Sequence, residues 1–155
     1  MISESRAYKY AVRCAENQDR KVGIYVQRQC LQWLEIVNGK NPKAYISHSQ
    51  WKKITKILKI IIHPDLDCSM HDGLEDYAML FIYAIFCTKN AKDSYRYYQT
   101  ALLEIARKNF KTFTSAVIFI IGLLSEPRFS RFFSVAPDLK LSSELKMAIR
   151  KIIKS

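Results

Sequence analysis

The chain has 155 residues, 49% of them apolar, with only four glycines and four prolines. This composition excludes low-complexity and disordered classes and supplies enough apolar surface for a packed core. The net charge of +11 favours polyanionic partners such as DNA, RNA, nucleotides or an anionic membrane face, although a basic surface can also serve solubility alone.

The cysteines and the apolar runs exclude further classes of protein. The four cysteines are Cys14, Cys30, Cys68 and Cys87. They form no C-x-x-C pair, which argues against a zinc ribbon or a redox motif and favours free thiols in a cytoplasmic setting. The chain opens on a polar stretch rather than a signal peptide. The apolar runs over residues 77–87 and 116–124 are shorter than the roughly 18 residues that span a bilayer, so no membrane association is expected.

The first ninety residues are predicted to be helical. Apolar residues at helical spacing predict a helix over Ile24–Val37, which Asn38 and Gly39 end. A second helix is expected through residues 51–61, stopped by Pro64, and a third over residues 74–87. These elements form an expected helical N-terminal region over residues 1–92.

The pattern changes in residues 93–155. An aromatic and apolar run over residues 97–105 predicts a strand, followed by a short basic loop and a buried helix over Lys111–Ser125. A second strand is predicted over residues 132–136 and a last helix over residues 142–154. The alternation predicts an α/β fold, in which the helical region precedes the first βαβα units of a parallel sheet.

The loop between the first strand and its helix carries the most specific chemistry. Its residues are Ala106, Arg107, Lys108, Asn109, Phe110, Lys111 and Thr112. The N–H groups at a helix start favour a bound anion, and a lysine and a threonine there suit terminal phosphates and Mg²⁺. The pattern G-x-x-x-x-G-K-[ST] would place glycines at Ile105 and Phe110, and both are missing. The alternative is an ordinary strand-to-helix turn with a basic start.

The electrostatics of this turn favour the phosphate interpretation. A basic residue at a helix N-terminus is unfavourable against the helix dipole by roughly 0.3–1 kcal/mol. Three basic residues, Arg107, Lys108 and Lys111, gather here. Their clustering makes physical sense if an anion fills the site.

Ala-Arg-Lys-Asn-Phe-Lys-Thr resembles the deviant Walker A loop of phage terminase large subunits, which often reads A/P-R-K-N-G-K-[ST]. Arg107 stands four residues before Lys111, as in that family. The helix after the loop, the stretch over residues 132–138 and the helix that follows it are similar to the family's next βα unit. The helical region before residue 90 resembles the family's N-terminal section more loosely. The resemblance covers most of the chain and is specific in residues 105–112.

The resemblance implies an ATP-driven motor that packages phage or prophage DNA, with the fold of a P-loop NTPase. Lys111 would bind the β- and γ-phosphates of ATP, Thr112 would help hold Mg²⁺, and Arg107 would contact the phosphates. The backbone N–H groups from Lys108 to Thr112 would line the cradle. The implied partners are double-stranded DNA, the terminase small subunit and the portal protein, with a homo-oligomer when the protein is complete, in the cytoplasm of a bacterial host.

The sequence departs from this family in what it lacks. Phe110 replaces a glycine, and no upstream glutamine is suited to read adenine. No apolar strand ending in a carboxylate follows the loop, so there is no Walker B strand, and the family's nuclease is absent. Arg128 and Arg131 are the candidates for an arginine finger. We therefore expect a truncated front portion of the ATPase domain, inactive on its own.

Two other functions fit the same residues. One is a non-enzymatic basic module that binds nucleic acid or a packaging partner and keeps a vestigial phosphate loop. The other is a regulatory decoy that joins the ring of a full-length motor.

Three further clusters have a functional and a structural interpretation. His63, Asp65, Asp67, Cys68 and His71 could bind a metal, but their spacing matches no usual zinc site and favours a polar loop. An exposed helix face carries Lys52, Lys53, Lys56 and Lys59, which favours solvent contact over DNA phosphates. Bases could stack on Tyr95, Tyr97 and Tyr98 beside Arg96, although a place in a sheet is the stronger prediction.

Overall fold

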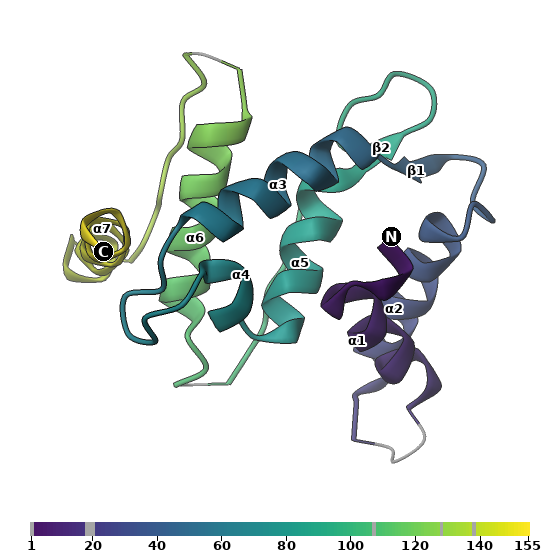
Figure 1. The fold of residues 1–155 in the computed structure, drawn as a ribbon, viewed down its shortest axis with the longest axis horizontal. Helices are drawn as coiled ribbons and strands as arrows, with labels where there is room; N and C mark the ends of the chain where they lie inside the picture. Colours follow the sequence, from purple (N-terminus) through teal and green to yellow (C-terminus); the bar gives the residue numbers. More distant parts are fainter. Residues whose placement is uncertain (1, 18–20, 107, 128, 138) are drawn as a thin grey trace. The chain divides into compact units, whose positions relative to one another are not determined.

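The computed structural model describes residues 2–17, 21–106, 108–127, 129–137 and 139–155. The chain divides into two compact units, Met1–Lys52 with Leu74–Ala101, and Lys53–Gly73 with Leu102–Ser155. Helices dominate both units, and the described residues add one small antiparallel sheet (Figure 1). The expected mixture of α and β structure is confirmed at that level. The boundary expected between residues 92 and 93 stays a prediction.

The first unit begins with a helix that the sequence analysis did not predict. A 3-10 turn, η1 (Ile2–Glu4), leads into α1 (Arg6–Glu16). The Ser5 hydroxyl caps α1 by accepting from the N–H of Tyr8 at 3.2 Å. Asn17 ends the helix in the left-handed conformation, at φ 41°, a conformation that asparagine tolerates.

Helix α1 packs against α2 (Ile24–Val37) and α5 (Asp76–Cys87). The predicted bounds of α2 are confirmed, but its buried side chains are Cys30, Trp33 and Ile36, and Ile24 and Leu31 are exposed. The three buried residues lie at spacings of three, which puts them on one face of the helix.

A side chain of α1 also fixes the start of α5. The Arg6 guanidinium donates from Nε to Asp76 Oδ1 at 2.9 Å and to the carbonyl oxygen of Leu74 at 2.7 Å. A planar guanidinium can hold both acceptors at once. Arg6 therefore ties the first helix to a helix that lies far away in the sequence.

The sheet joins two short strands that are distant in the chain. Strand β1 (Ala44–Ile46) pairs antiparallel with β2 (Thr88–Asn90), with Tyr45 opposite Lys89. Beside it, the rings of Trp51 and Tyr83 stack with centroids 3.8 Å apart. The pairing brings the segment before β1 next to the turn after β2.

The second unit contains α4 (Met70–Gly73), α6 (Lys111–Ser125) and α7 (Leu139–Lys154), together with most of α3 (His48–Ile60). The predicted bounds of α6 are confirmed, and α6 packs against α7. Gly122 allows a close approach on α6, because a Cβ there would lie 2.7 Å from Cε1 of the Phe132 ring.

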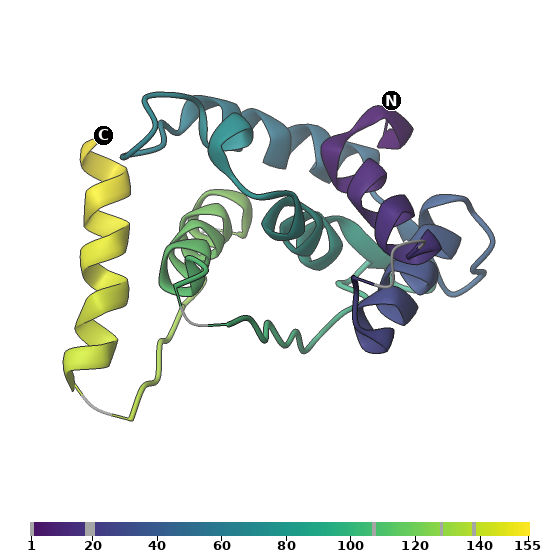
Figure 2. The same cartoon turned by 90° about the horizontal axis from the view of Figure 1, so that it is seen from below.

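Both predicted strands of the parallel sheet were wrong. Residues 97–105 and 132–136 contain no strand and run as a plain trace in Figure 2. The two strands of the described residues are antiparallel. Strand formation needs hydrogen-bonding partners from elsewhere in the chain, and two strands alone make a marginal sheet. The two segments therefore contain aromatic and β-branched residues that favour strands, but no neighbouring strand forms a ladder with them in the described residues.

The helices of the described segments differ from membrane-spanning helices. None of the described helices combines the length and the apolar character required to cross a bilayer. The apolar runs in α5 and α6 instead supply core residues such as Ile82 and Ile121, both fully buried.

Candidate functional site

The predicted phosphate loop leads directly into α6. Phe110 is the N-cap residue of this helix, and its carbonyl oxygen accepts from the N–H of Thr114 at 2.8 Å. The N–H groups of Lys111, Thr112 and Phe113 precede that first helical hydrogen bond, so helix geometry gives them no intrahelical acceptor. Lys111 and Thr112 thus stand in the first turn, as the sequence analysis expected.

The backbone of the loop is unusual for its residue types. Lys108 has φ 66° and Phe110 has φ 54°, both in the left-handed region. For a residue with a Cβ this conformation costs roughly 1–2 kcal/mol, which is why glycine is usual there. Phe110 occupies the position where the phosphate-loop pattern has its second glycine, and it adopts the conformation that a glycine would supply.

Alternation of left-handed and other residues has a further geometric consequence. Successive N–H groups in such a turn point to the same side and form a concave anion-binding nest. Lys108 and Phe110 are separated by one residue, Asn109, in this arrangement. The geometry of the turn is therefore compatible with a bound phosphate.

The charges around this turn are positive. Lys108 and Lys111 are exposed, the first turn of α6 carries no acidic residue, and the nearest preceding acid, Glu104, is exposed. The lysine charges add to the positive end of the helix dipole. This arrangement favours the binding of an anion.

The other predicted residues of the site are distributed as follows. Ala106 is exposed, Thr112 is half-buried and Phe110 has 63% of its surface exposed. Arg107 lies outside the described residues, as does Arg128, one of the two arginine-finger candidates. Arg131, the other candidate, is exposed.

For the cluster from His63 to His71, the sequence favours a polar loop over a metal site. Within the described ranges, no three His, Cys, Asp or Glu side chains gather in a way that could hold a metal ion. His63 is buried against the Phe113 ring, with centroids 4.8 Å apart, and its Nδ1 accepts from the Asp65 N–H at 3.2 Å. Asp65 accepts a hydrogen bond from Lys151. The loop interpretation of these residues is the one that the structure supports.

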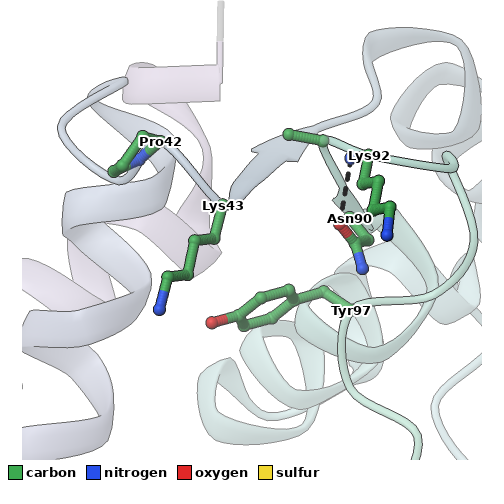
Figure 3. A pocket seen from close by; sticks show the side chains of 6 residues that line it. Pro42, Lys43, Asn90, Lys92 and Tyr97 are labelled. Carbon is green, nitrogen blue, oxygen red and sulfur yellow. Dashed lines mark hydrogen bonds between the residues drawn. The ribbon is translucent and has the colours of Figure 1, made fainter.

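A second feature lies in the first unit, and the sequence indicated only its tyrosines, not the pocket beside them. Residues beside the β1–β2 pair line an open pocket of about 510 Å³: Pro42, Lys43, Asn90, Ala91, Lys92 and Tyr97. Figure 3 shows Lys43 and Tyr97 reaching the same side of this pocket from two separate segments. Only the antiparallel pairing brings these segments together, and two three-residue strands give too weak a pattern to predict it.

Comparison with known proteins adds no relative. No family model, no curated protein and no solved structure matches the chain. The functional argument therefore depends on the residues and their geometry.

Proposed function

We propose that the loop over residues 105–112 binds the phosphates of ATP with Mg²⁺, as the nucleotide-binding front portion of a terminase-type DNA-packaging ATPase. The observation that carries the proposal is the left-handed backbone of Phe110, at the glycine position of the pattern, directly before a helix that begins with Lys111 and Thr112. The missing glycine is the strongest argument against a phosphate loop in the sequence. Phe110 nevertheless adopts the left-handed backbone conformation that a glycine at this position would supply.

Each part of the loop would act on a different part of the nucleotide. The N–H groups at the start of α6 would donate to phosphate oxygens, favoured by the helix dipole. The exposed Lys111 ammonium would neutralise the terminal phosphates, and the Thr112 hydroxyl would ligate the Mg²⁺ that accompanies them. The Phe110 side chain leaves less space for the nucleotide to approach the loop backbone than a glycine would.

The proposal is limited to binding for this chain alone. Hydrolysis of this kind requires a carboxylate that holds Mg²⁺ and another group that orients water. Neither strand of the described residues, Ala44–Ile46 or Thr88–Asn90, contains a carboxylate. A parallel P-loop sheet would require residues 97–105 and 132–136 to pair with further strands. The proposed partners follow the resemblance: double-stranded DNA, the terminase small subunit, the portal protein and further copies of the motor.

The test is a titration of a fluorescent ATP analogue with Mg²⁺. We expect saturable binding by the wild-type chain and a loss of at least about tenfold in Lys111→Ala, the size of one charge-assisted contact of about 1.4 kcal/mol. Lys59→Ala is the matched control, because Lys59 is also an exposed helical lysine. Equal affinity in Lys111→Ala and in the wild type would overturn the proposal.

A second variant tests the role of the backbone. Phe110→Gly keeps the left-handed conformation available without a side chain, so we expect it to tighten nucleotide binding. Phe110→Ala removes the ring but retains the Cβ penalty, and we expect a smaller gain. Weaker binding by Phe110→Gly would show that the aromatic ring contacts the nucleotide.

A further inference from the structure

A second charged and aromatic surface lies on the first unit, around the pocket beside β1 and β2. We call it the hairpin surface and define it by Lys43, Asn90, Lys92, Tyr95 and Tyr97. Tyr97 and both lysines line the pocket, and Tyr95 stands nearby with 75% of its surface exposed. None of these residues belongs to the loop over residues 105–112.

The backbone that carries the hairpin surface is held by a dense set of hydrogen bonds. The N–H of Ala91 donates to Lys43 O at 2.9 Å, which joins the two segments. The N–H of Asn90 donates to Tyr95 O at 2.9 Å, and that of Tyr97 donates to Thr88 O at 3.1 Å. These bonds fix the turn before any ligand arrives, which reduces the ordering entropy that binding would otherwise lose.

Side chains within the turn complete this framework. Asn90 Oδ1 accepts from the N–H of Lys92 at 3.0 Å, a bond drawn in Figure 3. Asp93 Oδ1 accepts from the N–H of Tyr95 at 2.9 Å. Asp93 therefore supports the turn, and the exposed Tyr95 side chain is carried by an anchored backbone.

The charge of this region is strongly positive. Residues 38–46 and 88–98 contain Lys40, Lys43, Lys89, Lys92 and Arg96. The same two stretches contain one carboxylate, that of Asp93. Five cations against one anion attract a phosphate backbone, and the exposed ring of Tyr95 and the half-buried ring of Tyr97 provide faces on which bases can stack.

We propose that the hairpin surface binds single-stranded nucleic acid. Lys43 and Lys92 contact backbone phosphates, while Tyr95 and Tyr97 stack on unpaired bases. Stacking selects a single strand over a duplex, because the bases of a duplex already stack on one another and hide their faces. The amide of Asn90 offers a hydrogen-bond donor to a base edge within the same pocket.

The first experiment measures fluorescence anisotropy of labelled oligothymidylate and oligouridylate of about 12 nucleotides, within the size range of known single-strand sites. Binding of both strands supports the proposal, and their ratio tells whether DNA or RNA is preferred. A duplex of equal length is expected to bind more weakly at the same salt concentration. Equal or tighter binding of the duplex would overturn the proposal.

The stacking residues are tested with a pair of equally exposed tyrosines. Tyr95→Ala is expected to weaken oligothymidylate binding about tenfold, in line with the loss of one base–aromatic stack. Tyr25→Ala is the matched control, since Tyr25 is 78% exposed on α2 of the same unit, and it should leave affinity unchanged. An equal effect of both variants, or none from Tyr95→Ala, would contradict the role of the hairpin surface.

The lysines are tested through the salt dependence of binding. The double variant Lys43→Ala/Lys92→Ala removes two proposed phosphate contacts, so the slope of log K against log salt should become shallower by about 1.4. The double variant Lys56→Ala/Lys59→Ala has the same net charge and alters two exposed lysines of α3. A larger change of slope in the α3 variant would move the binding site to α3 and overturn the proposal. Since neither variant touches Lys111, failure here leaves the ATP titration unaffected.

Discussion

Two parts of the chain place their large apolar residues in opposite environments. In the packed helices α1, α2 and α5, Ile82 is fully buried and Tyr83 is 1% exposed. In the segment between α6 and α7, Phe129 is 98% exposed and Val135 is 94% exposed. Both parts contain residues that favour burial, but in the second part Phe129 and Val135 stay exposed while Phe132 packs against an aromatic ring of α6.

The difference comes from where each kind of structure finds its hydrogen bonds. A helix pairs its backbone with residues four positions away, so its formation can be predicted from a short stretch of sequence. A strand needs a partner strand, which a local pattern does not supply. The segment over residues 132–136 has the composition of a strand and lacks a partner among the described residues.

The largest expected effect is a difference in thiol reactivity between cysteines inside the packed helices and a cysteine outside them. Burial raises the pKa of both Cys30 and Cys87 from 9.0 to about 12, so at pH 8 their thiolate fraction is lower by roughly a thousandfold. We expect iodoacetamide to modify the half-buried Cys68 long before either of them, as measured by mass spectrometry of the native protein. Rapid modification of Cys87 would mean that α5 is not packed as described.

A stability measurement compares the same two parts directly. Ile82→Ala should lower the free energy of unfolding by about 2–5 kcal/mol, because it leaves a cavity in a fully buried position. Phe129→Ala removes a larger side chain but should change stability by less than about 0.5 kcal/mol. Urea denaturation of both variants measures these changes. Equal losses in the free energy of unfolding would contradict the difference in packing between the two parts.

A smaller effect is expected at the loop before α6. Phe110→Gly should raise the free energy of unfolding by up to about 1 kcal/mol, because relief of the left-handed backbone exceeds the entropy that glycine adds to the unfolded chain. Phe110→Ala keeps the strain and should give no such gain in the same urea titration. Destabilisation by Phe110→Gly would instead assign a packing role to the exposed ring.

The smallest effect is electrostatic. The hydrogen bond from Lys151 lowers the pKa of Asp65 below its ordinary value. A lowered pKa in the folded state means that the ion pair stabilises the fold above pH 4 and loses this effect as the pH falls through the folded pKa. Asp65→Asn should therefore have a slightly lower Tm than the wild type at pH 6 and the same Tm near pH 2. An equal difference at both pH values would exclude the ion pair as its cause.

The sequence predicted α2 and α6 to the residue because both have apolar helical spacing and clear end signals, Asn38-Gly39 and Glu126-Pro127. It missed α1, whose buried face consists of the small residues Ala7, Ala11 and Cys14. Small side chains give a weak periodic signal, so local pattern was insufficient there.

The candidate sites show the same limit. Lys111 and Thr112 were placed correctly at a helix start, since that placement depends on local sequence. The left-handed Phe110 could not be foreseen, because phenylalanine disfavours that conformation. The hairpin surface depends on the pairing of β1 with β2, a long-range contact that the single sequence does not encode visibly.

Gly122 has a consequence for the behaviour of the protein at high concentration. The stretch Phe132-Phe133-Ser134-Val135-Ala136 is uncharged, free of proline and rich in β-forming residues, which is the composition of aggregation-prone segments. Its first ring fits over Gly122 of α6, and Arg131 and Pro137 flank it as gatekeepers against fibril growth. A bulky residue at position 122 would displace that ring, so Gly122→Leu should accelerate thioflavin-positive aggregation relative to the wild type. We therefore expect the absence of a side chain at Gly122 to limit self-association of the protein.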